Sequence, residues 1–571
     1  MHIAAAEPYR SRHKVRFVTA TSLFDGHDAA TNIIRRMLQA SGAEVIHLGH
    51  NRSVDAIVTA AIQEDAQGIA VSCYQGGHVP FFKYICDLLR ERGADHIKVF
   101  GGGGGVIVPE EVREIETYGV SKIFSPEDGR RMGLQGMINH MMELCDFTPE
   151  RDTDREIERL KERDIRAVNT LITLAEQAVH DQNEGYGAVR DRIRAMARDV
   201  PVVGITGTGG AGKSSLTDEL VRRFIRDFPE KSVAILAVDP SRQRTGGALL
   251  GDRIRMNSIN SDRIYMRSLA TRDSRSELSA AIRDALDVVR ASGFDLVIVE
   301  TSGIGQGDAG VVEICDVSLY VMTCEFGAPT QLEKIDMLDF ADLVALNKFE
   351  RKGAEDALRN VRKQYRRNRN LFEIPDTELP VYGTIASQFN DPGTNVLYRA
   401  LLDRVNEKKD AGWSSRLEVT ERESLKQYII PPDRVHYLGE IVHAVRGYRK
   451  DVEEQAGVAR TLFQLSGARA EVKGEGTVAE LDQLIGTFSA KLQEEPRRII
   501  DGWKSLKDCY RQDAQVTKVR DKEIRTELYT TSLSGTKIPK VCLPDYQDWG
   551  EIVKWSMKEN LPGFFPYTAG V

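Results

Sequence analysis

The sequence predicts an α/β protein with two successive parallel sheets, the first flavodoxin-like and the second built around a glycine-rich loop, followed by a largely helical region. From Val15 onward, short apolar runs alternate with segments whose apolar residues recur at helical spacing, a pattern typical of strands joined by helices. Further along, the β-branched run 202–206 leads into GTGGAGKSS and then into another helical pattern. Residues 414–536 are polar and mostly helical in pattern.

Composition limits the class of protein. The 571 residues, 41% hydrophobic and 29% charged, are enough for about three or four ordinary domains. A net charge of −7 gives no overall nucleic-acid footprint, and no apolar run approaches the length of a membrane span. Residues 1–12 lack the apolar core of a signal peptide, and the seven scattered cysteines never occur in CxxC spacing. We therefore expect a cytoplasmic protein with reduced thiols, and neither nucleic acid nor membrane as a partner.

The first domain is predicted from five apolar runs. They lie at residues 15–18, 44–48, 69–72, 98–100 and 122–124, with helix faces over 33–38 and 57–62. Five such units predict a flavodoxin-like sheet, in which a ligand binds at the carboxyl ends of the strands.

Unusual residues follow three of these strands. Asp25 and His27 follow the first, Ser72 ends the third, and five glycines at 101–105 follow the fourth. A lone histidine in such a loop most often faces solvent. The Asp-x-His spacing favours a metal ligand, because the carboxylate can accept the other ring N–H and so fix the tautomer and raise the basicity of the imidazole. The glycines would open a slot beside it.

These residues resemble the motif of the cobalamin-binding domains of mutases and methyltransferases that bind the cofactor base-off and His-on. The family pattern DxHxxG, SxL and GG corresponds here to Asp25, His27, Ser72, Gly102 and Gly103. Ala30 replaces the motif glycine, and Tyr74 replaces the leucine. The resemblance implies that His27 is the lower axial ligand of cobalt and that the displaced nucleotide tail lies in the slot.

The loop at 207–215 has the GxxxxGKS pattern of a phosphate-binding loop between a predicted strand and helix. Its glycines would let backbone N–H groups surround phosphate oxygens at the positive end of the helix. Lys213, the predicted catalytic residue, would place a charge between the β- and γ-phosphates, and the Ser214 hydroxyl would bind Mg²⁺. The alternative is a glycine-rich turn that binds nothing. The nucleotide-binding residues predicted here are Gly209, Gly210, Ala211, Gly212, Lys213, Ser214 and Ser215.

Acidic residues end two later apolar runs. Asp239 follows one run, and Glu300, with Thr301 after it, follows another. Either acid would serve as a helix cap, but beside a triphosphate it is also placed to hold Mg²⁺ directly or through water. Between them, Asp252 adds a carboxylate and Arg255 a side chain able to reach phosphate.

The sequence Asn347-Lys348-Phe349-Glu350 resembles the guanine-reading motif NKxD. In that motif the asparagine contacts the purine, the lysine packs along the base, and the aspartate accepts from two guanine N–H groups. Glu350 keeps an acceptor carboxylate, and adenine lacks these two donors, so the sequence favours GTP over ATP. Residues 383–387 are a weaker candidate for another contact to the base.

Together, the nucleotide motifs resemble those of the GTPase chaperones that serve cobalamin-dependent acyl-CoA mutases. The resemblance rests on VDPS at 238–241, LGDRIRM at 250–256 and ETSGIGQ at 300–306, and it spans about residues 164–413. It implies that Arg255 lies near the phosphates. The Mg²⁺ environment that it implies comprises Ser214, Asp239, Asp252, Glu300 and Thr301.

The end of the chain resembles the segment that opens the substrate barrel of methylmalonyl-CoA-type mutases, with Ala569 in place of an arginine. A (β/α)₈ barrel needs roughly 250 residues, so we expect the chain ending at Val571 to be the front half of a longer mutase. The expected organisation is a cobalamin-binding domain at 13–147, a linker at 148–164, a GTPase domain at 165–413, a helical linker at 414–560 and the start of a substrate domain at 561–571.

This order resembles that of the fused isobutyryl-CoA mutases. The resemblance implies an adenosylcobalamin-dependent rearrangement of isobutyryl-CoA to n-butyryl-CoA, with a GTP-hydrolysing domain that gates cofactor loading. Expected partners are the acyl-CoA substrate, GTP or GDP, an adenosyltransferase that delivers cobalamin, and a second copy of the chain in a homodimer. Two alternatives stay open: a free-standing cobalamin-delivery GTPase without mutase activity, and a cobalamin-sensing module. The sequence beyond Val571 would separate them.

Overall fold

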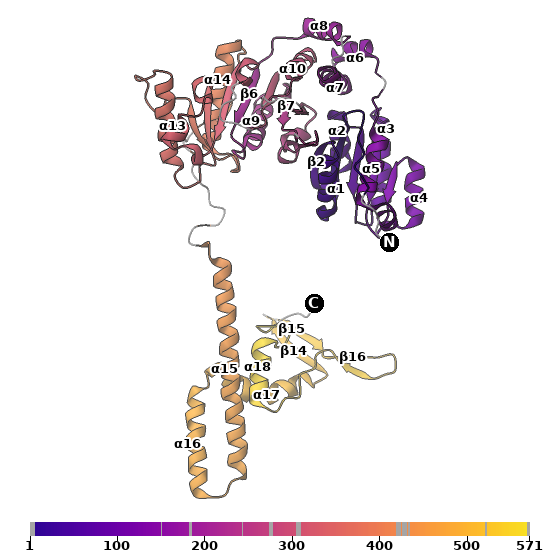
Figure 1. The fold of residues 1–571 in the computed structure, drawn as a ribbon. Coiled ribbons are helices and arrows are strands. Elements are labelled where there is room, and N and C mark those ends of the chain that lie inside the picture. The colour runs from indigo at the N-terminus through magenta and orange to yellow at the C-terminus, as the bar shows by residue number, and fades with distance from the viewer. Residues whose placement is uncertain are drawn as a thin grey trace. The chain divides into compact units, whose positions relative to one another are not determined.

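The computed structural model of the chain contains two compact units, Met1–Gln427 and Tyr428–Val571, and each is described by itself (Figure 1). The residues that the structure describes are 6–149, 151–181, 185–242, 244–272, 278–303, 310–417, 419, 424, 431, 434–519 and 522–567. Within these ranges, no helix combines the length and the apolar character needed to cross a bilayer.

The first sheet confirms the predicted flavodoxin-like architecture. Its strands β1 to β5 are Arg16–Ser22, Glu44–Arg52, Gly68–Ser72, Lys98–Gly102 and Lys122–Phe124. They are parallel and lie in the order β5-β4-β3-β1-β2. The alternating helices α1 to α5 are Asp28–Ala40, Val54–Gln63, His78–Glu91, Pro109–Tyr118 and Pro126–Cys145. The loops after β1, β3 and β4 therefore meet at one edge of the sheet.

A sixth strand of this sheet was not predicted, because it comes from much later in the chain. β8 (Ala248–Leu250) pairs in parallel with β2, with Glu44 opposite Ala248 and Ile46 opposite Leu250. Ala248 and Leu250 are fully buried in the core of the first sheet. The second α/β segment thus contributes a strand to the first sheet.

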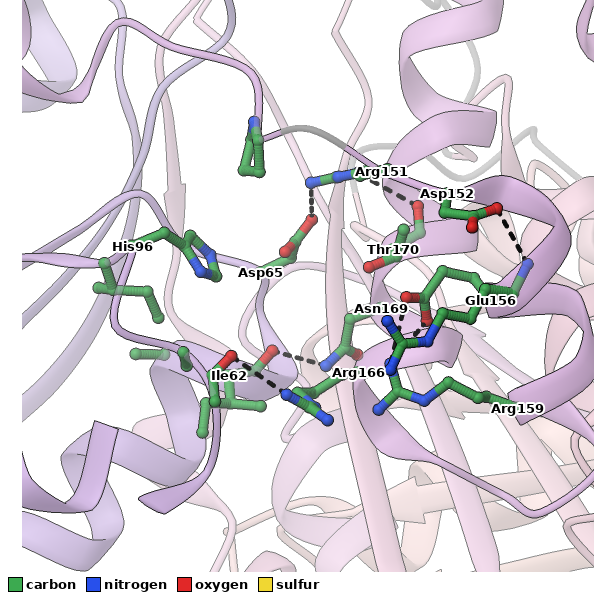
Figure 2. Close-up of a pocket in the computed structure, with 16 residues that line it drawn as sticks. Ile62, Asp65, His96, Arg151, Asp152, Glu156, Arg159, Arg166, Asn169 and Thr170 are labelled. Atoms are coloured by element: carbon green, nitrogen blue, oxygen red, sulfur yellow. Dashed lines mark hydrogen bonds and ion pairs between the residues drawn. The ribbon is translucent and has the colours of Figure 1, made fainter. Parts of the chain in front are cut away.

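After α5, the chain forms α6 (Thr153–Leu160), α7 (Ile165–Asp181) and α8 (Tyr186–Met196) before it enters the second sheet. The charged face of α6 is largely exposed, whereas Ile157 and Leu160 are buried in a core shared with the second sheet. Figure 2 shows how this region binds the first domain around a cavity of about 550 Å³. Arg151 Nη2 donates to Asp65 Oδ2 at 2.5 Å, and Asn169 Nδ2 donates to the carbonyl of Ile62 at 2.6 Å.

The second sheet is also entirely parallel, in the order β13-β12-β11-β6-β10-β7-β9. Its strands are β6 (Val202–Gly207), β7 (Val233–Asp239), β9 (Ile264–Ala270), β10 (Leu296–Glu300), β11 (Val317–Met322), β12 (Leu343–Asn347) and β13 (Val381–Thr384). Its α-helices are α9 (Lys213–Asp227), α10 (Ile282–Ala291), α11 (Pro329–Leu332), α12 (Met337–Phe340), α13 (Ala354–Asn368) and α14 (Pro392–Lys409). Short 3₁₀ turns are η1 (Asp252–Arg255), η2 (Ser258–Asn260), η3 (Gly310–Glu313) and η4 (Cys324–Phe326).

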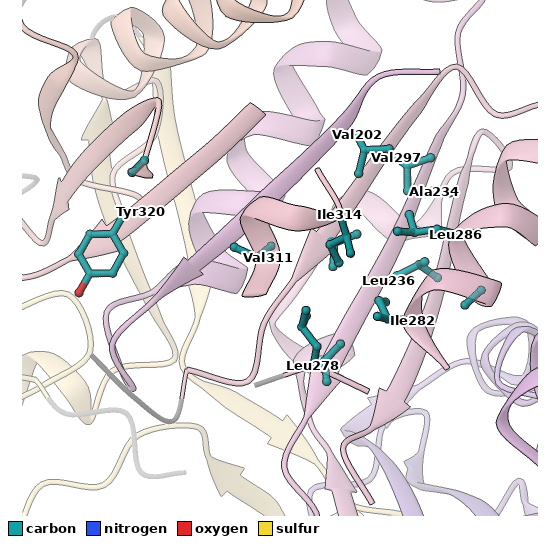
Figure 3. Packing of buried hydrophobic residues seen from close by; sticks show 14 of the residues in the cluster. Val202, Ala234, Leu236, Leu278, Ile282, Leu286, Val297, Val311, Ile314 and Tyr320 are labelled. Carbon is teal, nitrogen blue, oxygen red and sulfur yellow. The ribbon is translucent and has the colours of Figure 1, made fainter. Parts of the chain in front are cut away.

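Helices cover both faces of the second sheet. On one face, Val202, Ala234 and Val297 pack in a cluster that includes Ile282 and Leu286 of α10 (Figure 3). The other face packs against α9 and α14. Because its strands are buried on both sides, they read in the sequence as continuous apolar runs.

The second unit is largely helical, as predicted. Its helices are α15 (Tyr437–Glu471), α16 (Glu475–Lys491), α17 (Glu494–Tyr510) and α18 (Trp549–Lys558). Two antiparallel pairs were not predicted: β14 (Ala514–Val519) with β15 (Lys522–Glu527), and β16 (Tyr529–Thr531) with β17 (Lys537–Pro539). Their short, mostly polar sequences lack the alternation that reveals a strand.

Candidate functional site

The predicted phosphate-binding loop connects β6 to α9. Gly207, Gly210 and Gly212 have φ angles of +149°, +74° and +91°, which favour glycine. At Gly207 a Cβ would also come within 1.9 Å of the carbonyl oxygen of Val321. The backbone therefore curls at the start of a 15-residue helix, where its N–H groups and the helix dipole favour an anion.

Lys213 is buried and its side chain folds over this loop. Its Nζ donates to the carbonyl oxygens of Gly207 at 3.1 Å and Thr208 at 3.4 Å. The Thr208 hydroxyl is buried without a hydrogen-bond partner among the described residues. A phosphate group in the loop would supply an acceptor for this hydroxyl and a counter-charge for the ammonium group.

Ser214 and Glu300 form the acidic side of the loop. Ser214 Oγ donates to Glu300 Oε1 at 2.6 Å, and Thr217 Oγ1 donates to Glu300 Oε2 at 3.1 Å. Only 1% of Glu300 is exposed. Hydroxyl and carboxylate oxygens are the ligands that Mg²⁺ prefers. The sequence reasoning missed Thr217, whose only signal is its position one turn after Ser214 on the same helix.

The other predicted magnesium residues lie around this side. Thr301 Oγ1 donates to Thr206 Oγ1 at 2.8 Å and so joins the ends of β10 and β6. Asp239 Oδ2 accepts from the backbone N–H of Gly251 at 3.1 Å, which brings the VDPS and LGD segments together. Arg255 is exposed on η1. The side chain of Asp252 and residues 304–306 lie outside the described part of the chain.

The predicted guanine-reading residues approach the loop from β12. Asn347 Nδ2 donates to the carbonyl of Ala211 at 2.8 Å, and Lys348 Nζ donates to the carbonyl of Gly210 at 2.7 Å. Asn347 Oδ1 accepts from Ala386 N–H at 3.1 Å, so residues 383–387 do reach this motif.

The two remaining motif residues differ in burial. Phe349 packs closely against Gly383, where an added Cβ would lie 2.7 Å from the ring. Glu350 is exposed at the start of the following turn. Asn347 and Lys348 therefore contact the phosphate-binding loop, and the Glu350 carboxylate stays accessible.

A second site lies at the carboxyl edge of the first sheet. His27 Nδ1 lies 2.8 Å from Asp25 Oδ1, and the backbone N–H of Tyr74 donates to Asp25 Oδ2 at 2.6 Å. Burial alone would raise the pKa of Asp25, but the hydrogen bonds from Tyr74 and His27 outweigh it and lower that pKa. An ionised Asp25 favours the tautomer protonated at Nδ1, which leaves Nε2 as the available ligand. The His27 side chain is 73% exposed, and the Tyr74 ring lies 5.1 Å from it between centroids.

A cavity of about 350 Å³ opens beside this pair, lined by residues of α1, α5 and the ends of β3 and β4. Ala30, Ser72, Gly102 and Gly103 are among its lining residues. The Ser72 hydroxyl is buried and has no hydrogen-bond partner among the described residues. A mostly apolar slot with one orphan hydroxyl fits a flat heterocycle that carries a hydrogen-bonding edge.

Comparison with known proteins identifies both regions. Residues 15–127 match the B12 binding domain family, and residues 168–431 match the family described as "Methylmalonyl Co-A mutase-associated GTPase MeaB". The fold and sites thus define a B12-binding domain joined to a P-loop GTPase domain.

Two curated relatives match nearly the whole chain. The chain is 61% identical to a fused isobutyryl-CoA mutase of Geobacillus kaustophilus over 99% of its own length, and 55% identical to one of Cupriavidus metallidurans over 98%. Over nearly its whole length, the chain is thus similar to fused isobutyryl-CoA mutases. It covers 53% and 51% of these relatives and so spans about half of their length.

Proposed function

We propose that this chain binds adenosylcobalamin and Mg²⁺-GTP, hydrolyses GTP, and uses hydrolysis to gate the cofactor for a mutase that converts isobutyryl-CoA to n-butyryl-CoA. The names of the relatives support the acyl-CoA substrate. Because the chain spans about half of those proteins, the mutase step is proposed for a longer protein. A homodimer, an adenosyltransferase partner and a cytoplasmic location belong to the same proposal.

The contact between Ser214 and Glu300 beside Lys213 carries the GTPase part. Lys213 would exchange its backbone carbonyl partners for β- and γ-phosphate oxygens, and Ser214 would turn its hydroxyl from Glu300 to Mg²⁺. Glu300 would then hold the metal directly or through water, with Asp239 on the neighbouring strand. This arrangement places positive charge where negative charge develops during phosphoryl transfer.

The pair of Asp25 and His27 carries the cofactor part. Asp25 holds Nδ1 of the imidazole, so Nε2 would be presented to cobalt, while Ser72 and the glycine-lined slot would hold the nucleotide tail. Adenosylcobalamin, when bound, would supply the radical chemistry of the rearrangement. The part of this chain is to bind and orient the cofactor.

Substituting one residue in each site tests the proposal. His27→Ala should remove the His-on absorption spectrum of bound cobalamin and weaken binding, whereas GTP hydrolysis without cobalamin should persist. Lys213→Ala should abolish GTP hydrolysis and leave cobalamin binding without nucleotide unchanged. An unchanged spectrum in His27→Ala would contradict the axial ligand, and unchanged hydrolysis in Lys213→Ala would contradict the GTPase site.

Gating is tested by titrating adenosylcobalamin with and without a non-hydrolysable GTP analogue. A nucleotide can change cofactor affinity only through its differential binding to two arrangements, typically by about 1–3 kcal/mol, and the effect must be reciprocal. Lys213→Ala should abolish this effect. Equal affinities and equal transfer rates in both titrations of a mutase-complete protein would exclude gating.

A further inference from the structure

The segment around the predicted magnesium carboxylates is built into the first domain. β8 lies two residues before Asp252, and the backbone N–H of Ala248 donates to the carbonyl of Ala43 at 3.1 Å. At Gly247, an added Cβ would come within 2.1 Å of the carbonyl oxygen of Gln39, so the two backbones are in close contact. The position of this segment is therefore set by the first sheet.

Glu64, at the end of α2, holds the residues that follow β8. Arg253 Nε donates to Glu64 Oε1 at 3.2 Å, and Arg253 Nη2 donates to the carbonyl of Met266 at 2.6 Å. Ser268 N–H donates to Glu64 Oε2 at 3.0 Å. Glu64 is 0% exposed and Arg253 5%. One buried carboxylate of the first domain thus binds both η1 and β9 of the second.

Glu44, on β2, binds Arg272, which follows β9. Arg272 Nε donates to Glu44 Oε1 at 2.9 Å, and the backbone N–H of Arg272 donates to Ser241 Oγ at 2.8 Å. Burial alone would raise the pKa of Glu44, but the charges of Arg272 and Arg16 outweigh it and hold that pKa far below its usual range. Glu44 is therefore ionised at neutral pH and keeps Arg272 paired.

The segments held by Glu64 and by Glu44 both contact Asp239. Thr271 N–H donates to the carbonyl of Asp239 at 3.0 Å, directly before Arg272. Gly251 N–H donates to Asp239 Oδ2 at 3.1 Å, two residues before Arg253. The carboxylate predicted to serve Mg²⁺ is thus connected on both sides to residues held by the first domain.

We propose that Glu64 and Glu44 of the first domain are positioning residues for GTP hydrolysis, which hold Asp239 and the LGD segment in place through Arg253 and Arg272. The proposal rests on the proposed GTPase function. Neither glutamate needs to touch the nucleotide. Loss of the Glu64 carboxylate removes the counter-charge of the buried Arg253, so the segment that carries this arginine must rearrange. Loss of Glu44 removes one of two carboxylates that pair with Arg272, because Glu176 also contacts this arginine.

The test is GTP hydrolysis by the full chain without cobalamin, measured over a range of Mg²⁺ concentrations. Glu64→Gln keeps the shape of the side chain and removes its charge. It should lower kcat at least tenfold or raise the half-saturating Mg²⁺ concentration at least tenfold, with KM for GTP at saturating Mg²⁺ within about twofold. The matched control is Asp65→Asn, because Asp65 is the adjacent residue and pairs with Arg151 rather than with the LGD segment. Asp65→Asn should keep the Mg²⁺ dependence of the unmodified protein.

The outcomes separate this inference from the proposed function. No hydrolysis by the unmodified protein would overturn the GTPase function and this inference with it. Hydrolysis with the same Mg²⁺ dependence and kcat in Glu64→Gln, or an equal effect of Asp65→Asn, would overturn this inference alone. If Glu64→Gln does not fold, Glu64→Gln combined with Arg253→Met removes the unpaired charge, and the same tenfold criterion applies to that double variant.

Discussion

Gly103→Ala should damage the candidate cobalamin slot more than the same substitution at Gly102 or Gly105. An added Cβ at this position would lie 2.1 Å from the carbonyl oxygen of Cys73 and 3.0 Å from Ile107 Cγ1. A backbone oxygen cannot rotate away as a flexible side chain can, so the turn after β3 must shift. Overpacking of this kind costs about 1–3 kcal/mol in a packed interior. We expect a loss of that size in the free energy of unfolding, measured by urea titration.

The same shift should reach His27, the proposed cobalt ligand. Cys73 precedes Tyr74, whose backbone N–H holds Asp25, and Asp25 in turn orients His27. Because displacement of Asp25 would misplace His27, cobalamin should bind more weakly to Gly103→Ala, and about 1.4 kcal/mol of lost binding free energy corresponds to a tenfold loss of affinity. Absorption spectroscopy during titration with adenosylcobalamin measures this change.

Two nearby glycines provide graded controls. An added Cβ at Gly102 would lie 3.5 Å from the carbonyl oxygen of Phe124, an ordinary contact, and at Gly105 it would meet nothing within 4 Å. Gly102→Ala should therefore be nearly neutral in the free energy of unfolding, and Gly105→Ala neutral or stabilising by up to about 1 kcal/mol. Equal stability in all three variants, with equal cobalamin affinity in Gly103→Ala and Gly105→Ala, would refute the close-approach argument.

Three further substitutions test other parts of the chain. Glu350→Asp should keep or sharpen the preference for GTP over ATP in hydrolysis assays, and equal turnover of both nucleotides by the unmodified protein would refute the guanine assignment. Glu300→Gln should lower GTP hydrolysis by roughly a hundredfold through loss of the charge beside Ser214, with partial recovery at high Mg²⁺, and full activity would contradict its role. Burial and the charge of Arg35 lower the pKa of His47 to about 4, so the unfolded chain binds more protons between pH 6.5 and 4 and stability falls as the pH drops. His47→Gln should therefore reduce the loss of unfolding free energy between pH 7.5 and 5 by up to about 2 kcal/mol. Urea titrations at the two pH values measure this loss, and an equal loss in the variant and the unmodified protein would contradict the prediction.

Five strands of the first sheet and several of the second could be predicted because burial leaves a local signal, whereas β9 and β11 were not predicted. β6 and β10 are covered on both faces and read as largely apolar runs, and the glycines at 207, 210 and 212 indicate a loop that only a few residue types can form. The pairing of Asp25 with His27 could be predicted for the same reason, since it depends on two residues two positions apart.

Contacts between distant segments left no such signal. β8 is three residues long, and its partner β2 lies some two hundred residues earlier in the chain. Arg253 resembles any surface arginine in the sequence, yet it is buried against Glu64. A buried charge can be recognised only when its counter-charge is known, and that pairing is set by the tertiary fold.

These unpredicted contacts join the two candidate sites physically. β1 lies between β2 and β3 in the first sheet, and the loop after β1 carries His27, while β2 pairs with β8 on its other side. A nucleotide that moves the segment after β8 must therefore either strain the β2–β8 pairing or move β2 with it. The first outcome would confine the effect of GTP to the second domain. The second would reach β1, which leads into the loop that carries His27. If that loop binds cobalamin as proposed, the reciprocity of binding free energies requires the cofactor to alter GTP affinity by the same factor.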